Sequence, residues 1–499
     1  MSAQPAGPPP ASPERRRHRA VFRRYDFEDI FHDEMFERDG TPRAYCRDVF
    51  DTLQKTPPDE LQRIQERVTR SFLHEGITFT VYGDEEAIER AFPIDCIPRI
   101  VLGSDWDRVV RGLEQRIQAL NLFLHDVYHR GLILRDGVVP ADMIYGSRHY
   151  RNEMRGLEVP HGAYVSVCGS DLVRTHDGFA VLEDNLRVPS GVSYMLACRD
   201  ALKRSMPRLY RRSRVRDVED YSQRLLATLA SLASPHLSDP NIVLLTPGVY
   251  NSAYYEHAFL ARQMGIELVE GRDLLVHNRR VYMRTTAGLR AVDVIYRRID
   301  DDFMDPLAFR PDSVLGVPGL FHAYRAGRVV IANAPGTGVA DDKGVYAYVP
   351  RIIRYYLDEE PLLQNVPTTL CREPEGLAYT LANLDKLVVK LVGESGGYGM
   401  LVGPHATREE RAEFAEVLKE NPLDYISQPT LALSRAPCLV GSRIEPRHVD
   451  LRPFILTSDH TEIVPGGLCR VALRKGSLVV NSSQGGGSKD AWIVDPNGS

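Results

Sequence analysis

The stretch Gly169–Gly191, GSDLVRTHDGFAVLEDNLRVPSG, is the part of the chain around which the rest is organised. Residues 168–173 alternate weakly between polar and apolar, residues 176–178 (HDG) form a turn, and residues 179–182 are a short apolar run. Strand-like runs on both sides of a tight turn are typical of a β-hairpin. The stretch therefore predicts two paired strands.

Three oxygen-bearing side chains of this hairpin are candidate metal ligands. Asp171 lies on the first strand, whereas Glu183 and Asn185 end the second strand one residue apart and so share a face. Mg²⁺ prefers such hard oxygen donors and is usually held by one or two carboxylates together with substrate phosphates. The hairpin predicts either a Mg²⁺ site or, as the alternative, an acidic turn that water solvates.

Length and composition are those of an ordinary globular protein. The 499 residues, 43% hydrophobic and 26% charged, indicate several domains with sizeable cores. A formal net charge of -5 argues against general nucleic-acid binding. We find neither an apolar run of membrane-spanning length nor a signal peptide, so no membrane partner is expected. The seven cysteines are scattered and never spaced as CxxC, which predicts neither a disulfide framework nor a zinc site and favours the cytoplasm.

The N-terminal third is predicted to be a tail followed by helices. Residues 1–20 are rich in proline and alanine and end in a basic cluster, so a disordered tail is expected there. Residues 21–150 read as mainly helical. In the clearest helix we expect Ser104 as the N-cap and Gly131 at the stop. Arg116 on this helix either reaches a ligand or makes a surface ion pair.

A different pattern begins after residue 235 and predicts a parallel α/β domain over residues 236–335. A strand (242–245), an amphipathic helix (255–264) and a second strand (266–269) form a β-α-β unit. GxGxxG is absent, so dinucleotide binding is not supported. The charged run 297–302 follows a further strand, and such strand ends commonly bind ligands. The alternative is a loop of exposed paired charges, which we favour for the residues of this run other than its arginines.

The last third holds residues suited to phosphates. Lys343 lies in the first turn of a predicted helix (344–357), where free backbone N–H groups favour an anion. Lys390 lies within an apolar strand (387–392), where an ammonium group needs a carboxylate or phosphate partner. The loop 393–399, GESGGYG, follows at once, and its backbone can close over phosphates. A simple hairpin turn is the alternative for the loop.

These parts together resemble the ATP-grasp ligases. In most ATP-grasp proteins the lysines and the lid precede the Glu-x-Asn motif, whereas here the motif comes first. That order resembles the circularly permuted ATP-grasp proteins, and the chain is similar to the synthetase domain of glutathionylspermidine synthase. The blocks that carry this resemblance are YGDEEAIERAFPIDCIPRI, VLEDNLRVPSGVSYML and VNSSQGGGSKDAWIV.

The resemblance implies a fold and a set of roles. The fold is α/β, a circularly permuted ATP-grasp domain whose metal-binding half is 151–235 and whose lysine and lid half is 336–499. A pre-ATP-grasp-like domain lies between them in sequence, and the helical region precedes them. The implied ligands are Asp171, Glu183 and Asn185 for Mg²⁺; Lys343 and Lys390 for the ATP phosphates; Gly396, Gly397 and Gly399 for the lid; and Ile426 and Gln428 for the adenine hinge.

The implied activity is that of an ATP-dependent carboxylate–amine ligase that forms an amide through an acyl phosphate. Arg452, Arg470 and Arg297 are candidates for holding the carboxylate and the acyl phosphate, although each could instead be a structural ion pair. The family pattern has an arginine two residues before the first metal aspartate, where this chain has Gly169. Arg187, Arg452 or Arg470 could replace it. Expected partners are small-molecule or peptide acids and amines, and the alternative function is a non-catalytic, nucleotide-binding partner of another protein.

Overall fold

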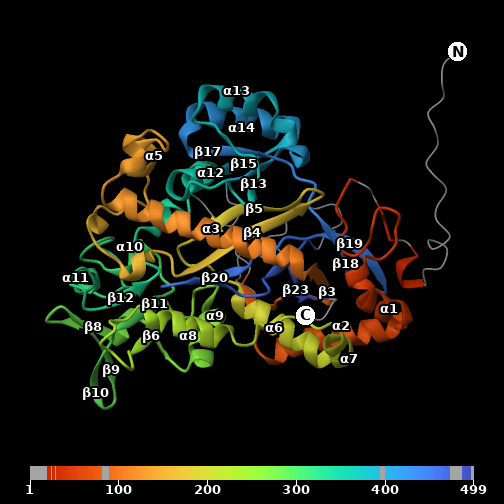
Figure 1. Cartoon of the computed structure of the whole chain (residues 1–499), viewed down its shortest axis with the longest axis horizontal. Coiled ribbons are helices and arrows are strands. Elements are labelled where there is room, and N and C mark those ends of the chain that lie inside the picture. Colours follow the sequence, from red (N-terminus) through yellow and green to blue (C-terminus); the bar gives the residue numbers. More distant parts are fainter. Residues whose placement is uncertain are drawn as a thin grey trace.

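A computed structural model gives the fold of the chain (Figure 1) and describes residues 20–23, 25–27, 30–80, 89–393, 399–472 and 486–495. The predicted tail, except for Ala20, lies outside these ranges, as do the lid glycines Gly396 and Gly397.

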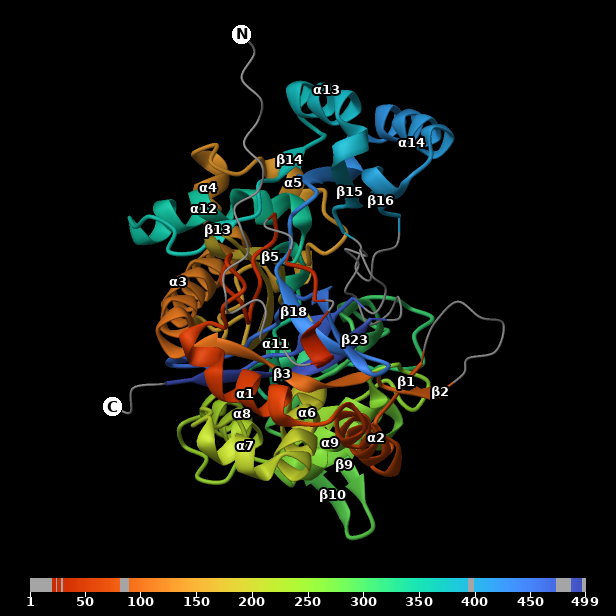
Figure 2. The ribbon, with the colours of Figure 1, turned by 90° about the vertical axis from the view of Figure 1, so that its right-hand side faces the viewer.

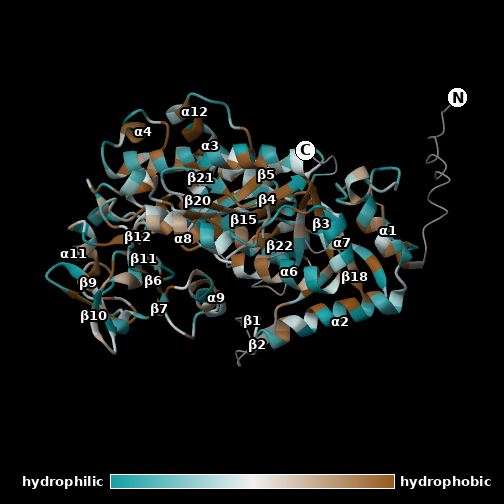
Figure 3. Cartoon of the chain, turned by 60° about the horizontal axis from the view of Figure 1, so that its bottom comes forward, coloured by the Kyte–Doolittle hydropathy of each residue, from teal (hydrophilic) through white to brown (hydrophobic). Residues whose placement is uncertain are grey.

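Helices occupy much of the N-terminal half and recur later in the chain. Their bounds are α1 (Arg47–Lys55), α2 (Pro58–His74), α3 (Gly103–Tyr128), α4 (Leu132–Arg135), α5 (Ala141–Tyr145), α6 (Val192–Ser205), α7 (Pro207–Arg212), α8 (Tyr221–Ser231), α9 (Tyr254–Met264), α10 (Asp301–Met304), α11 (Leu320–Arg325), α12 (Lys343–Leu357), α13 (Pro374–Ala382) and α14 (Arg408–Glu420). Helix α2 shows why such segments fold as helices, because its buried side chains recur at helical spacing: Leu61, Ile64, Val68 and Phe72. The rest of α2 is largely hydrophilic and lies at the periphery (Figure 3).

The strands form a central sheet, a small antiparallel sheet, a parallel sheet and several shorter groups. In sheet order they are β13 (Gln364–Asn365), β5 (Gly178–Asn185), β4 (Val167–Thr175), β20 (Phe454–Thr457) and β21 (Thr461–Ile463); β14 (Thr369–Leu370), β17 (Tyr425–Pro429), β15 (Leu387–Leu391) and β16 (Leu401–Val402); β12 (Val330–Ala332), β11 (Val294–Arg297), β6 (Ile242–Leu245) and β7 (Glu267–Val269); β22 (Cys469–Val471), β23 (Gly487–Val494) and β3 (Ile94–Leu102); β10 (Gly288–Ala291), β9 (Arg280–Thr285) and β8 (Leu274–His277); β18 (Arg435–Val440) and β19 (Arg443–His448); and β1 (Thr78–Thr80) and β2 (Glu89–Ala91).

The predicted hairpin is confirmed as β4 and β5, which pair in antiparallel fashion within the central sheet. Helix α3 crosses the molecule over this sheet (Figure 1). The predicted β-α-β unit is also confirmed, since β6 and β7 are parallel neighbours and β11 and β12 extend the same parallel sheet.

The small antiparallel sheet (β14-β17-β15-β16) carries α13 and α14. Figure 2 shows these two helices at the opposite end of the molecule from α7 and α9. The capping box expected at Thr407 is present, because the Thr407 side chain accepts from the N–H of Glu410, whose side chain accepts from that of Thr407. The expected hinge strand is β17, which pairs with β15 along its whole length.

One sequence prediction about the N-terminal third is wrong. Helix α3 begins at Gly103 with Leu102 at the N-cap, so Ser104 lies inside the helix and does not cap it. The helices α1 to α5 lie in this region together with β3, a strand of nine residues that was not predicted and that pairs in parallel with β23, near the end of the chain. Among the described helices none is long and apolar enough to cross a membrane.

Candidate functional site

The hairpin aligns the three predicted metal ligands. Asp171 lies opposite Glu183 and Gly169 lies opposite Asn185 in the β4–β5 register, which shifts just after Asp171. The amide nitrogen of Asn185 donates to the carbonyl oxygen of Gly169 at 3.0 Å. Its oxygen thereby remains an acceptor. The backbone register therefore places all three predicted ligands at the same end of the hairpin.

Asp171 is the buried centre of an arginine cluster. Its two oxygens accept from Arg452, Nε to Oδ1 at 2.5 Å and Nη2 to Oδ2 at 2.9 Å, and Oδ2 also accepts from Arg470 Nη2 at 2.5 Å. Arg470 in turn pairs with the buried carboxylate of Asp450. Burial alone would raise the pKa of the Asp171 carboxyl, but the two guanidinium groups outweigh burial and lower this pKa below its usual range.

Short backbone pairings bring these distant residues together. Leu172 and Leu451 exchange hydrogen bonds of 2.7 and 2.9 Å, so the segment before β20 lies beside β4. The backbone of Arg452 pairs in the same way with Leu468, just before β22. Three segments that are remote in sequence thus meet at the acidic end of the hairpin.

Gly169 makes room for Arg452. A Cβ atom added at Gly169 would lie 3.1 Å from Cδ of Arg452 and 3.3 Å from Cβ of Pro189. The aliphatic part of the Arg452 side chain therefore packs directly over the position where the resembled family has its arginine. Of the three candidates to replace that arginine, Arg452 and Arg470 contact Asp171, whereas Arg187 pairs with Asp341 at 2.6 Å.

The two predicted phosphate lysines lie close to this acidic end. Lys343 Nζ is 3.6 Å from Glu183 Oε2, and Lys390 Nζ donates to Gln428 Oε1 at 2.8 Å. Burial lowers the pKa of Lys390, the carboxylate of Glu183 opposes this effect and the ammonium group of Lys343 adds to it, with a net lowering. The lysines and arginines therefore act electrostatically on the same carboxylates.

The start of α12 differs from the prediction of free N–H groups. The N–H groups of Gly344 and Val345 both donate to the N-cap Asp342, and the N–H of Lys343 donates to the carbonyl oxygen of Val392 at 3.0 Å. These donors are occupied, because a capping carboxylate satisfies the first turn. Lys343 is thus held by its backbone at the end of β15, and only its side chain points to a phosphate role.

The predicted hinge and lid residues follow β15. Ile426 lies opposite Lys390 in the β15–β17 register and is buried, and Gln428 links Lys390 to Thr368. Gly399 has φ +64° just before β16, a conformation that favours glycine, and a Cβ there would clash with Leu391.

Arg297 is not part of this cluster. It is fully buried, and its guanidinium donates to the carbonyl oxygens of Ile299, Asn333 and Ala334 and pairs with Asp301 at 2.7 Å. The interpretation of the run 297–302 as an exposed loop, which was favoured for its residues other than the arginines, is therefore wrong for Asp301, because Asp301 is buried in an internal ion pair with Arg297.

Arg116 also departs from the two roles considered for it. It is buried and binds the Asp184 carboxylate through Nε at 2.9 Å and Nη2 at 2.7 Å, and Ser170 donates to the same carboxylate. This ion pair fixes α3 to β5 next to Glu183 and Asn185.

Two further residues of the site gave no local sequence signal. Asp341 accepts from the N–H of Leu186 and from Arg187, both at 2.6 Å, so it ties the segment after β5 to the start of α12. Arg148 donates to the carbonyl oxygen of Gly393, where the glycine loop begins, at 2.8 Å. Only a pairing pattern across homologous sequences could have revealed such long-range contacts.

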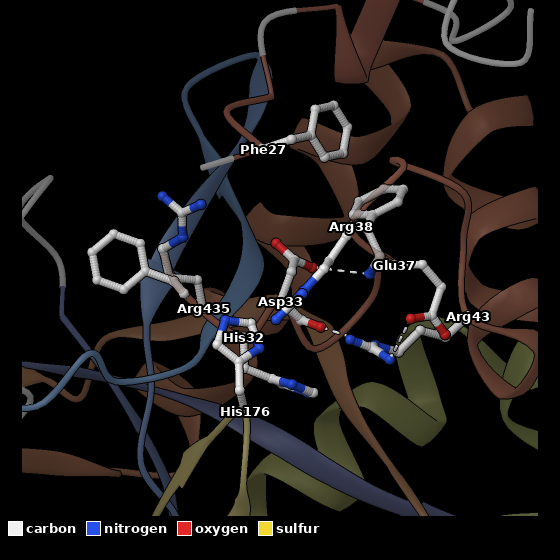
Figure 4. Close-up of a pocket in the computed structure, with 10 residues that line it drawn as sticks. Phe27, His32, Asp33, Glu37, Arg38, Arg43, His176 and Arg435 are labelled. Atoms are coloured by element: carbon white, nitrogen blue, oxygen red, sulfur yellow. Dashed lines mark hydrogen bonds and ion pairs between the residues drawn. The ribbon is translucent and has the colours of Figure 1, made fainter. Parts of the chain in front are cut away.

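A separate cavity of about 300 Å³ lies at the turn end of the same hairpin (Figure 4). His176, in the turn, lies 5.9 Å from His32 between ring centroids, and Arg435 of β18 also lines the cavity. Arg43 is paired with Glu37 at 2.9 Å, as Figure 4 shows. This cavity is distinct from the lysine and arginine cluster at the acidic end.

The order of these parts in the chain is that of a permuted domain, with the hairpin before the lysines. Residues 98–472 match the family described as circularly permuted ATP-grasp type 2. The chain belongs to this family.

Relatives of this circularly permuted ATP-grasp protein cover nearly all of it. An uncharacterized protein of Synechocystis sp. is 53% identical over 93% of the chain and 97% of its own length, and one of Mycobacterium tuberculosis is 47% identical over 96% of the chain and 87% of its own length. A protein of Frankia alni, named as a candidate glutamate–cysteine ligase, is 42% identical over 93% of the chain, which spans 54% of that longer protein. A glutathione synthetase-like effector from Globodera pallida has the same fold, with a TM-score of 0.55, 10% identity, and coverage of 88% of this chain and 98% of that one.

Family and fold together confirm the α/β, circularly permuted ATP-grasp architecture. The protein is an enzyme of the ligase class. The match does not single out glutathionylspermidine synthase, since the named neighbours are similar to glutathione synthetase and glutamate–cysteine ligase.

Proposed function

We propose that the protein is an ATP-dependent ligase that joins a carboxylate to an amine through an acyl phosphate. The observation that carries the proposal is the convergence of two lysines and two arginines on one end of the β4–β5 hairpin. Lys343 lies 3.6 Å from Glu183 and Arg452 lies 2.5 Å from Asp171. Such a cluster of cations suits the charge that develops during phosphoryl transfer.

The hairpin supplies a donor set that fits Mg²⁺. The Glu183 side chain is half-buried, with 27% exposed, and the Asn185 oxygen is left as an acceptor. Asp171 can join them through the acceptor position of Oδ1 that Arg452 leaves open, since a carboxylate has about four such positions. When bound there, Mg²⁺ supplies positive charge to the phosphate oxygens.

For ATP we propose Lys343 and Lys390 at the phosphates and the β17 residues Ile426 and Gln428 at the adenine. The Lys390–Gln428 hydrogen bond orients the ammonium group before ATP binds. Gly399 marks the end of the glycine loop, whose Gly396 and Gly397 we assign to the lid from the resemblance.

The chemical steps follow from these positions. A substrate carboxylate attacks the γ-phosphorus of ATP, forming a C–O–P linkage as ADP leaves. An amine nitrogen then attacks the acyl carbon and forms the C–N bond. The acyl C–O bond breaks, and inorganic phosphate leaves with that oxygen and with the proton that the amine gives up. Arg452 and Arg470, whose guanidinium groups pair with Asp171 at this end of the hairpin, supply positive charge beside the carboxylate and then beside the acyl phosphate. Arg297 is left out, because it binds Asn333, Ala334 and Asp301 and not the carboxylates of the hairpin.

The substrates we propose are an amino acid or small peptide carboxylate and an amine. The relative named for glutamate–cysteine ligation supports this class. The seven cysteines are buried free thiols, which supports a reducing cytoplasm as the location. A non-catalytic nucleotide-binding role is the second candidate, favoured only by Gly169 in place of the family arginine.

A thermal-shift titration followed by a turnover screen tests the proposal. Mg-ATP should raise the melting temperature and ATP without Mg²⁺ should do so less, as linkage requires of a native-state ligand. Pairs of amino acids and amines should then release ADP only when both are present. Lys390→Met should weaken ATP binding at least tenfold, about 1.4 kcal/mol, while Lys386→Met, an exposed lysine before β15, should not.

One outcome separates the two candidate functions, and another tests the position of the nucleotide. ATP binding without turnover on any acid–amine pair would favour the binding role. Unchanged ATP binding in Lys390→Met would mean that the nucleotide lies elsewhere.

A further inference from the structure

Two histidines and a glutamate meet at the end of α3, in a place that the proposed ligase chemistry does not use. His125 lies in the last turn, His129 follows four residues later, and Glu158 precedes the turn Pro160–Gly162. One ligand atom from each of the three residues lies within 4.8 Å of the others. The two imidazole rings stack at 4.1 Å between centroids, as residues four apart on a helix can.

The hydrogen bonding of His129 fixes its tautomer. Nδ1 of His129 lies 2.8 Å from the carbonyl oxygen of His125. A carbonyl oxygen only accepts, so the proton is on Nδ1. In the neutral ring, Nε2 then carries a lone pair. This is the arrangement by which metal-binding histidines are usually oriented.

Nε2 of His129 faces a second acceptor. It lies 3.3 Å from Glu158 Oε1, yet it is buried and has no hydrogen-bond partner among the described residues. A lone pair on Nε2 and a carboxylate oxygen this close repel each other unless a cation lies beside both, either a proton on Nε2 or a metal ion. His125 Nδ1 lies 4.0 Å from the other oxygen of Glu158. His125 is therefore a third possible metal ligand close to the other two.

We propose that His125, His129 and Glu158 bind one divalent transition metal ion of the Zn²⁺ type. Two imidazole nitrogens and one carboxylate suit Zn²⁺, Co²⁺ or Ni²⁺ rather than Mg²⁺, which prefers oxygen ligands. Three protein ligands leave a coordination position open. The scattered cysteines gave no reason to expect zinc, because the ligands here come from a helix end and a loop.

The position of the site makes it accessible and separates it from the hairpin. The side chains of His125 and Glu158 are 43% and 77% exposed. His125 also lines a cavity of about 610 Å³ between α3 and the turn before β21. It lies nine residues after Arg116, about 13 Å along the helix axis from the residue that fixes α3 below the hairpin. Solvent metal can therefore reach the site without entering the proposed nucleotide site.

Metal titration of the tag-free, chelator-treated protein tests this site without using activity. We expect one Zn²⁺ per chain by calorimetry and a visible Co²⁺ absorption band that Zn²⁺ abolishes. Millimolar Mg²⁺ should leave the Zn²⁺ stoichiometry and the Co²⁺ band unchanged. The double variant His125→Ala/Glu158→Gln should lose affinity by more than roughly tenfold, since even the loss of a supporting partner weakens metal binding about that much.

Controls separate metal binding from an ordinary ion pair. His460→Ala, an exposed histidine on the same cavity, should bind Zn²⁺ like the wild type. Of the substituted ligands, Glu158 is largely exposed and His125 is partly exposed, so the melting temperature of the double variant in chelator should stay close to that of the wild type. Equal Zn²⁺ affinity of the double variant and the wild type, or displacement of Zn²⁺ by Mg²⁺, would overturn the proposal. So would a wild type that binds no Zn²⁺, which would leave a protonated His129 paired with Glu158.

Discussion

At the scale of single residues, the site holds an ionised carboxylate in a buried position. Asp171 is fully buried and would be strongly disfavoured as an anion, but Arg452 and Arg470 keep it ionised. Glu183, in contrast, is half-buried and its described cation partner, Lys343, is 3.6 Å away. The two opposing carboxylates therefore differ: Asp171 is held by two arginines, which leave it one acceptor position on Oδ1, whereas Glu183 is partly open to solvent and to a ligand.

This difference predicts the effect of Glu183→Gln. The substitution keeps the shape of the side chain but removes the charge, so Mg²⁺-dependent stabilisation by ATP and ADP release should both fall at least tenfold. The melting temperature without ligand should change little, because the side chain is partly solvated. Asp177→Asn, at the exposed turn of the same hairpin, is the matched control and should behave like the wild type. Full Mg-ATP stabilisation in Glu183→Gln would place the metal elsewhere.

At the scale of elements, what could be predicted from the sequence depended on how local each signal was. The hairpin and the capping box at Thr407 are set by residues within a few positions of one another, and both are confirmed. Strand β3 was missed because it is buried on both faces, which erases the alternation of polar and apolar residues. Its partner β23 lies at the other end of the chain.

The range of each signal also explains which residues of the site could be predicted. Lys343, Lys390 and the Glu-x-Asn motif could be predicted from residue type and order. The contact of Arg452 with Asp171 spans 281 residues and has no local pattern. The occupied N–H groups of α12 were missed because an N-cap aspartate and a binding site for an anion have the same sequence signature.

The cap of α12 supports a prediction at this scale. Asp342 accepts from Gly344 and Val345 and so sets the first turn that carries Lys343. Asp342→Ala should lower the free energy of unfolding by about 1 kcal/mol and weaken ATP binding by displacing Lys343. Asp342→Asn keeps a hydrogen-bond acceptor and should retain most of the stability and most of the ATP affinity. Stability and ATP affinity, measured by urea unfolding and calorimetry, should therefore change together; a loss of stability with unchanged ATP affinity would separate the cap from the site.

At the scale of the whole molecule, one buried glutamate joins the N-terminal segment to both halves of the fold. Glu34 accepts from Arg99 of β3 at 2.6 Å and from Arg174 of β4 at 3.3 Å. Its backbone N–H donates to the carbonyl oxygen of Arg435, on β18, at 2.8 Å. The segment before α1 is thus tied to the strand that carries Asp171 and to the strand that pairs with the chain end.

This junction predicts how stability depends on pH. Burial would raise the pKa of Glu34, but Arg99 and Arg174 reverse this and lower it from 4.5 to about 2. A carboxyl with a lowered folded-state pKa stabilises the fold above its unfolded value, and the contribution is lost as pH falls from about 4.5 to about 2. Glu34→Gln should therefore destabilise the protein by about 3 kcal/mol at pH 7, and the difference from wild type should shrink between pH 4.5 and 2. Glu37→Gln breaks a surface pair whose glutamate is 54% exposed and should cost less than about 1 kcal/mol at any pH. Urea unfolding of both variants across this range checks the prediction. A Glu34→Gln penalty that stays constant with pH would show that the lost contacts, rather than the charge of Glu34, hold the junction together.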